Sequence, residues 1–171
     1  MFDPTAFDNM KVVIEGAIYD LDLSGEIVIT DRNDYMNMAK MSRKFDICFQ
    51  LPGKRTSAKI EMNSNLINLA AELSPTPESV RFAGCNLKLE FLFKSDGNRI
   101  DYQAIATLFS EIWGPSRKIT QTVQLNPLFL EKKKHIITVG FERLIHEEQI
   151  DDLVDMTEYM ITSLNSLEKL I

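Results

Sequence analysis

Strict alternation of apolar and polar residues is the clearest pattern in this chain. In residues 45–51 the odd positions are apolar, and in residues 58–62 the even positions are apolar. A period of two is typical of a strand with one buried face. Residues 52–56 between them contain Pro52 and Gly53, which favour a turn. The two segments are therefore predicted to pair as a hairpin.

Other parts of the chain show strand-like patterns of the same kind. Residues 12–23 and 26–30 are predicted to form a second hairpin around Ser24 and Gly25. A change of phase at Gly84 predicts a bulge there. The remaining predicted strands are 80–82, 86–93, 119–125 and 135–141. Residues 33–42 are compatible with both a short helix and an irregular strand.

Three segments carry apolar residues at helical spacing. Residues 66–73 follow Ser64, a candidate N-cap, and end before the proline-rich segment 74–77. In a second helix, Asn98 and Asp101 resemble a capping box, and the apolar repeat runs from Ile105 to Trp113. A third apolar stripe extends from about residue 147 to residue 170, with acidic residues in its first turns.

These elements predict a single α+β domain over residues 1–171. Its sheet is expected to be mainly antiparallel with about six to eight strands, hairpins alternate with helices, and a long amphipathic helix ends the chain. The order strand, strand, helix recurs about four times. The corresponding ββα-type units lie near 11–42, 44–74, 80–113 and 117–170. Residue identity between them is too slight to establish an internal repeat.

Composition and charge narrow the classes of partner. The chain has 171 residues, of which 44% are hydrophobic and 26% charged, as is typical of a globular protein. The net charge of −6 is concentrated in residues 142–171, which hold eight acids and two bases. This acidity disfavours binding to a phosphate backbone, so nucleic acid is an unlikely partner.

The chain is expected to be cytoplasmic. Residues 1–4 do not resemble an export signal, and the apolar runs are too short to span a membrane. The two cysteines, Cys48 and Cys85, lie in strand-like segments and are interpreted as reduced, buried thiols.

Two apolar segments are candidates for binding a partner. The first lies between two predicted strands, where three apolar residues precede three lysines. It could project and dock on a partner or on an anionic surface. Alternatively, its apolar residues fold back beneath the sheet. The second is a group of methionines, whose flexible side chains suit both partner binding and core packing. The candidate residues are Leu128, Phe129, Leu130, Lys132, Lys133, Lys134, Met36, Met38 and Met41.

Candidate catalytic and metal-binding groups are sparse. His146 with Glu147, and Asp20 with Asp22, are the titratable clusters to consider for catalysis or, for the aspartates, cation binding. Residues 151–155 spell DDxxD, which we interpret as the acidic first turn of a helix. No catalytic residue, metal site or cofactor is assigned.

Three functions remain open. The first is a non-catalytic protein-interaction or adaptor module that associates with itself, as a homodimer for example, or with another protein. The second is a small-ligand-binding domain with a cavity between the sheet and the C-terminal helix. The third is an enzyme whose reaction the sequence does not identify.

Overall fold

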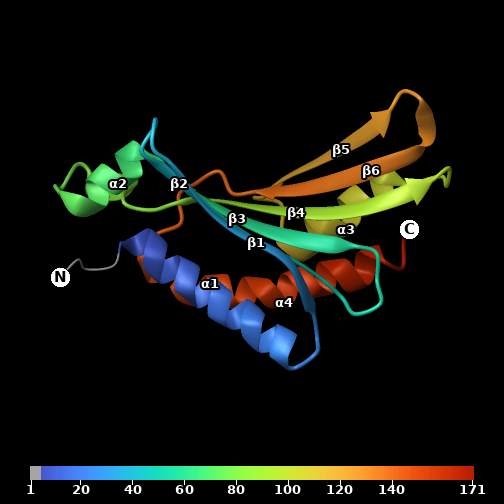
Figure 1. Ribbon diagram of the computed structural model, residues 1–171, viewed down its shortest axis with the longest axis horizontal. Coiled ribbons are helices and arrows are strands. Elements are labelled where there is room, and N and C mark those ends of the chain that lie inside the picture. The colour runs from blue at the N-terminus through green and yellow to red at the C-terminus, as the bar shows by residue number, and fades with distance from the viewer. Residues whose placement is uncertain (1–4) are drawn as a thin grey trace.

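One antiparallel sheet with helices on one of its faces forms the body of the protein (Figure 1). The computed structural model describes residues 5–171. Its six strands are β1 (Val28–Asn37), β2 (Ser42–Gln50), β3 (Ser57–Ser64), β4 (Asn86–Asp96), β5 (Lys118–Asn126) and β6 (Phe129–Gly140). Its helices are α1 (Ala6–Leu23), α2 (Leu66–Leu73), α3 (Tyr102–Trp113) and α4 (Ile150–Leu167), and two 3₁₀ turns, η1 (Val80–Phe82) and η2 (Glu147–Gln149), complete the set. The predicted α+β class and antiparallel sheet are confirmed.

The strands lie in the order β1-β2-β3-β4-β6-β5, so β1 and β5 form the two edges. Every neighbouring pair is antiparallel. The predicted hairpin over residues 45–62 is confirmed, with Ile47 opposite Ile60 in β2 and β3. The spatial order follows the chain order from β1 to β4 and then departs from it. After α3, β5 lies at the edge of the sheet, and β6 returns between β5 and β4.

The inner face of the sheet carries the core. Along β2, β3 and β4 every second side chain is buried, as the alternating pattern predicts. Figure 1 shows α1 and α4 packed across this face. From α3, the ring of Phe109 meets Phe91 of β4 edge to face, with ring centroids 4.9 Å apart.

The outer face is covered by no helix among residues 5–171, and charged pairs on neighbouring strands satisfy one another there. Lys59 of β3 lies opposite Glu90 of β4 with an N–O distance of 2.7 Å. Lys88 of β4 lies opposite Glu61 of β3 at 3.2 Å. Oppositely charged residues that face one another on neighbouring strands stabilise the strand register. They also keep this broad face polar, so that it needs no helix to cover it.

The strand prediction for residues 12–23 is wrong, because these residues belong to α1. Thr5 caps the helix, accepting a hydrogen bond from the backbone N–H of Asp8. The buried positions are Phe7, Met10, Ile14 and Ile18. Their spacing of three and four residues is that of a helix face. The prediction was based on the adjacent β-branched residues of this segment, which favour a strand. The first hairpin of the sheet is formed by β1 and β2 instead.

Two further assignments change. Residues 33–37 continue β1, and a turn follows at residues 38–41, where Met41 has a φ of 50°. Residues 80–82 form the η1 turn rather than a strand. Gly84 therefore marks no bulge: a Cβ there would meet the carbonyl oxygen of Ile145 at 2.5 Å, so the glycine allows two backbones to approach closely.

The predicted helices exist, although two of their caps lie elsewhere. Asn65 rather than Ser64 caps α2 in a reciprocal capping box with Asn68. Asp101 rather than Asn98 caps α3, which ends at Gly114 with a φ of 82°, a conformation that favours glycine. The C-terminal stripe begins with η2 and continues as α4.

The element order differs from the predicted succession of hairpin and helix. Residues 44–74 and 117–170 each contain two strands followed by a helix, but residues 11–42 begin within α1 and residues 80–113 contain one strand. Within residues 5–171, none of the helices combines the length and hydropathy needed to cross a bilayer. The expectation that the chain begins without an export signal concerns residues 1–4, which lie outside the described residues.

The helical assignment of residues 12–23 gives a direct test. In a strand, Val12 and Ile14 would share one face, whereas in α1 Ile14 is fully buried and Val12 is 62% exposed. We expect Ile14→Ala to lower the free energy of unfolding by about 2–5 kcal/mol, and Val12→Ala to change it by less than about 0.5 kcal/mol. Urea denaturation of both variants measures the two values. Equal losses would contradict the assignment.

Candidate functional site

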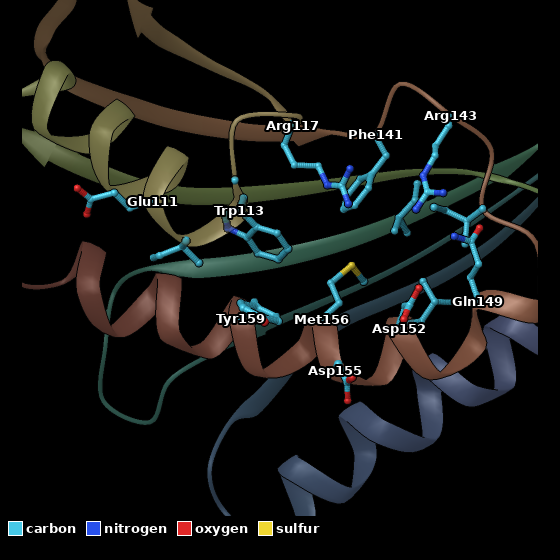
Figure 2. Close-up of a pocket in the computed structure, with 15 residues that line it drawn as sticks. Glu111, Trp113, Arg117, Phe141, Arg143, Gln149, Asp152, Asp155, Met156 and Tyr159 are labelled. Atoms are coloured by element: carbon cyan, nitrogen blue, oxygen red, sulfur yellow. The ribbon is translucent and has the colours of Figure 1, made fainter.

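A cleft of about 460 Å³ opens between α4, the end of α3 and the segment that follows β6 (Figure 2). Its apolar wall is built by residues from four parts of the chain, namely β4, α3, the segment after β6 and α4: Leu87, Trp113, Phe141, Ile145, Leu153, Met156 and Tyr159. Trp113 is held in place because its Nε1–H donates to Ser163 Oγ of α4 at 3.0 Å. The volume lies in the range of small-molecule sites.

Two arginines converge on this cleft. Arg117 precedes β5, and its guanidinium lies over the ring of Phe141, 4.5 Å from the centroid. Arg143 follows β6. Figure 2 shows both side chains reaching from the strand side towards α4. Neither forms an ion pair with any residue of the described chain, 5–171. Their donors therefore remain available to a ligand.

Three exposed acidic side chains also border the cleft. In Figure 2, Asp155 points away below α4 and Glu111 points outwards from α3. Asp152, in the first turn of α4, lies on the wall facing the arginines. The two arginines thus share one wall, and the carboxylates lie on α3 and α4, with Asp152 facing the arginines.

The segment with three lysines forms the tip of the β5–β6 hairpin. Asn126 pairs with Phe129, so the loop consists of Pro127 and Leu128, and Phe129 starts β6. The predicted connection over residues 126–134 is thus mostly strand. We call Leu128, Phe129, Leu130, Lys132, Lys133 and Lys134 the β5–β6 tip.

The apolar residues of the β5–β6 tip do not fold back beneath the sheet. Leu128, Phe129 and Leu130 are 83%, 59% and 60% exposed. A shallow groove of about 360 Å³ beside them is lined by all three lysines of the tip and by Lys94 of β4. Within residues 5–171 these four lysines have no ion-pair partner. The tip therefore combines exposed apolar surface with lysines that form no ion pair, although Asp96 also lines the groove.

The three methionines lie at the other end of the molecule. Met36, Met38 and Met41 are exposed around the β1–β2 turn, so they do not fill the core. Figure 1 shows this turn at the same end as α2. We define the α2 end by the exposed apolar residues gathered there: Tyr35, Met36, Met38, Met41, Leu66, Ile67, Leu73, Val80 and Phe82.

An apolar groove of about 410 Å³ runs along the α2 end between α2 and η1. Ile67, Ala70 and Phe82 contribute to its walls. Few charges interrupt residues 66–82, which contain Glu72, Glu78 and Arg81, and Glu72 is turned inwards to accept a hydrogen bond from the backbone N–H of Ala6. The β1–β2 turn adds the exposed Lys40. The apolar repeat in residues 66–73 predicted α2. It did not indicate that α2 lies beyond the edge of the core.

The histidines have structural partners. His146 Nδ1 lies 2.8 Å from the carbonyl oxygen of Ala83, and His146 forms a capping box with Gln149. Its neighbour Glu147 instead accepts a hydrogen bond from Asn9. Asp22 accepts from the backbone N–H of Ile29 at 3.1 Å, and Asp20 is an exposed residue of α1 rather than of a strand. The pair His146 and Glu147 and the pair Asp20 and Asp22 therefore have structural roles at the ends of helices and strands.

A different group of potential metal ligands lies on the outer face of the sheet. One atom each from Asp31, Asp46 and Cys48 falls within 4.8 Å of the others. Both carboxylates already accept hydrogen bonds from Asn33 Nδ2, each at 3.0 Å. Burial and the neighbouring Asp46 raise the pKa of the Cys48 thiol to about 11, so it stays protonated and is a poor ligand at neutral pH.

The other cysteine is likewise a protonated thiol. Cys85 is buried next to Met10, and burial raises its pKa to about 12. Both cysteines are free, although Cys48 is only half-buried. Neither offers the thiolate that a nucleophile requires.

No family model, curated protein or solved structure matches the chain. The functional argument therefore depends on its own surfaces and cleft.

Buried His135 predicts a pH dependence of stability. Its ring stacks on Phe93, Ser95 Oγ lies 2.8 Å from Nε2, and burial with Lys133 nearby lowers its pKa below the usual 6.5. The folded state thus binds fewer protons than the unfolded state, so this contribution to stability is complete above about pH 6.5 and is lost as the pH falls below it.

The expected result is a free energy of unfolding that decreases from pH 7 to pH 5, with a shallower slope in His135→Phe, which keeps the stacking surface. Urea titrations at several pH values measure both slopes. Parallel slopes would show that His135 does not carry the effect.

Proposed function

We propose that this chain is a non-catalytic protein-interaction module that forms a homodimer through the α2 end. The observation that carries the proposal is the apolar groove between α2 and η1, which is lined by the exposed side chains of Leu66, Ile67 and Phe82. The β1–β2 turn, at the same end of the molecule, adds exposed Met36, Met38 and Met41. Apolar surfaces of this kind on soluble proteins mark interaction sites. Homodimer interfaces are also more apolar than interfaces between transient partners.

Charge distribution favours a second copy as the occupant. Each chain carries a net charge of −6, so two copies repel one another except where their facing surfaces lack charge. The groove between α2 and η1 is apolar along its walls, and a two-fold contact would place this groove against itself. Isologous pairing through the groove therefore buries apolar surface while the charges beside it, such as Lys40 of the β1–β2 turn, stay at the rim.

The β5–β6 tip is unsuited to the same contact. A two-fold axis through it would bring Lys132, Lys133 and Lys134 of two copies together, and like charges at close range destabilise an interface. We assign the tip instead to a different protein partner, whose surface offers carboxylates around an apolar pocket. A dimer formed through the α2 end would carry two such tips at a distance from its interface.

The dimer is tested by sedimentation velocity over a range of protein concentrations. The unmodified chain is expected at twice its mass of 19.6 kDa. Ile67→Glu places a carboxylate in each half of the apolar contact, and burying an unpaired charge costs several kcal/mol, so its dissociation constant should rise at least about a hundredfold.

Two matched variants locate the contact. Leu23→Glu adds the same charge at an exposed leucine, at the far end of α1, and Phe129→Glu adds it at the β5–β6 tip. Both should remain dimers. A monomer at all concentrations, or dissociation by Phe129→Glu but not by Ile67→Glu, would refute the assignment. Growth into open-ended polymers would instead indicate head-to-tail contacts.

A further inference from the structure

Beyond self-association, we propose that the cleft between α3 and α4 binds a small amphipathic anion, in which a carboxylate or phosphate is attached to an aromatic or aliphatic body. Arg117 and Arg143 would hold the anion, and Trp113, Met156 and Tyr159 would contact the body. The α2 end has no part in this site, so the two proposals stand or fall separately.

The arginines are the reason for choosing an anion. Both enter the cleft with no carboxylate within ion-pair distance among residues 5–171, although this chain is acidic and its other surfaces pair charges across strands. The Arg117 guanidinium lies over the ring of Phe141, and this cation–π contact holds the group at the cleft without using its N–H donors. Planar guanidinium groups hold carboxylates and phosphates through two parallel hydrogen bonds.

The shape of the cleft is the reason for an apolar body. Its floor is formed by Trp113 and Tyr159, whose ring centroids are 5.9 Å apart, and by the flexible thioether of Met156. The hydrogen bond from Trp113 to Ser163 anchors the indole before any ligand arrives. A preformed apolar wall with a few polar groups at one side is the usual form of a small-molecule site. Asp152, on the facing wall, is placed to accept a hydroxyl or amide hydrogen bond from the ligand.

The probe for this site is 8-anilinonaphthalene-1-sulfonate, which joins an aromatic body to one oxyanion. Trp113 is the single tryptophan of the chain and lines the cleft, so energy transfer from its indole reports the bound dye. The titration uses Ile67→Glu protein to reduce dye binding at the apolar α2 end. N-phenyl-1-naphthylamine provides nearly the same body without the charge.

The test compares Arg117→Gln/Arg143→Gln with the control Arg55→Gln/Arg99→Gln. The control removes the same number of charges from exposed arginines that line neither the cleft nor the groove at the α2 end. We expect the cleft variant to bind the sulfonate dye at least about tenfold more weakly than the parent protein, since charge-assisted hydrogen bonds are lost. The control should keep the parent's affinity, and the neutral dye should bind the parent and both double variants equally. Circular dichroism checks that each variant is folded.

Competition with the bound dye identifies the anion. Displacement by 1-naphthylacetate indicates a carboxylate ligand, and displacement by 1-naphthyl phosphate indicates a phosphate ester; either result supports the proposal. Equal dye affinity in the cleft variant and the control would overturn it. Stronger competition by protonated 1-naphthylmethylamine would also overturn it, because the acidic residues of the rim would then determine the preference.

Discussion

The structure depends on one contact: the packing of α1 and α4 on the inner face of the central strands. The alternating apolar residues of β2, β3 and β4 need a layer that excludes water, and the apolar stripes of these two helices supply it. No second helical layer exists within residues 5–171, so the outer face must be polar. The crossed pairs of Lys59 with Glu90 and Lys88 with Glu61 meet that requirement.

The helical layer is smaller than the sheet, and the candidate functional surfaces lie where the cover ends. Val123 and Leu125 of the edge strand β5 lie opposite His135 and Lys133 of β6, and both are exposed. The β5–β6 tip projects beyond this point. At the opposite end α2 turns away from the core, and between α3 and α4 the incomplete junction leaves the cleft with its two arginines. The proposed dimer contact and the proposed ligand site thus follow from the same incomplete cover.

Local patterns predicted much of this fold, and the errors have physical causes. The alternation of residues 45–51 and 58–62 determined β2 and β3, because a buried face imposes a strict period of two. Residues 12–23 were mistaken for a strand since Val12, Val13 and Ile14 favour extended structure locally, whereas burial of Ile14 and Ile18 against the sheet decides for the helix. Phe129 is exposed because a two-residue loop joins β5 and β6. The residue composition of the segment did not reveal this. A cavity between the sheet and the C-terminal helix was one of the alternatives drawn from the sequence. Its residues could not be named in advance, because Arg117, Phe141 and Arg143 become neighbours only after the chain folds.

The central claim is that the α2 end is covered by a second copy of the chain. Hydrogen–deuterium exchange of the unmodified protein at low and high concentration tests it most directly, because a contact protects the backbone at and beside the buried surface. The account predicts that rising concentration slows exchange in residues 35–42 and 65–82, while residues 128–134 of the β5–β6 tip exchange at an unchanged rate. Slower exchange at the tip, with none at the α2 end, would contradict it.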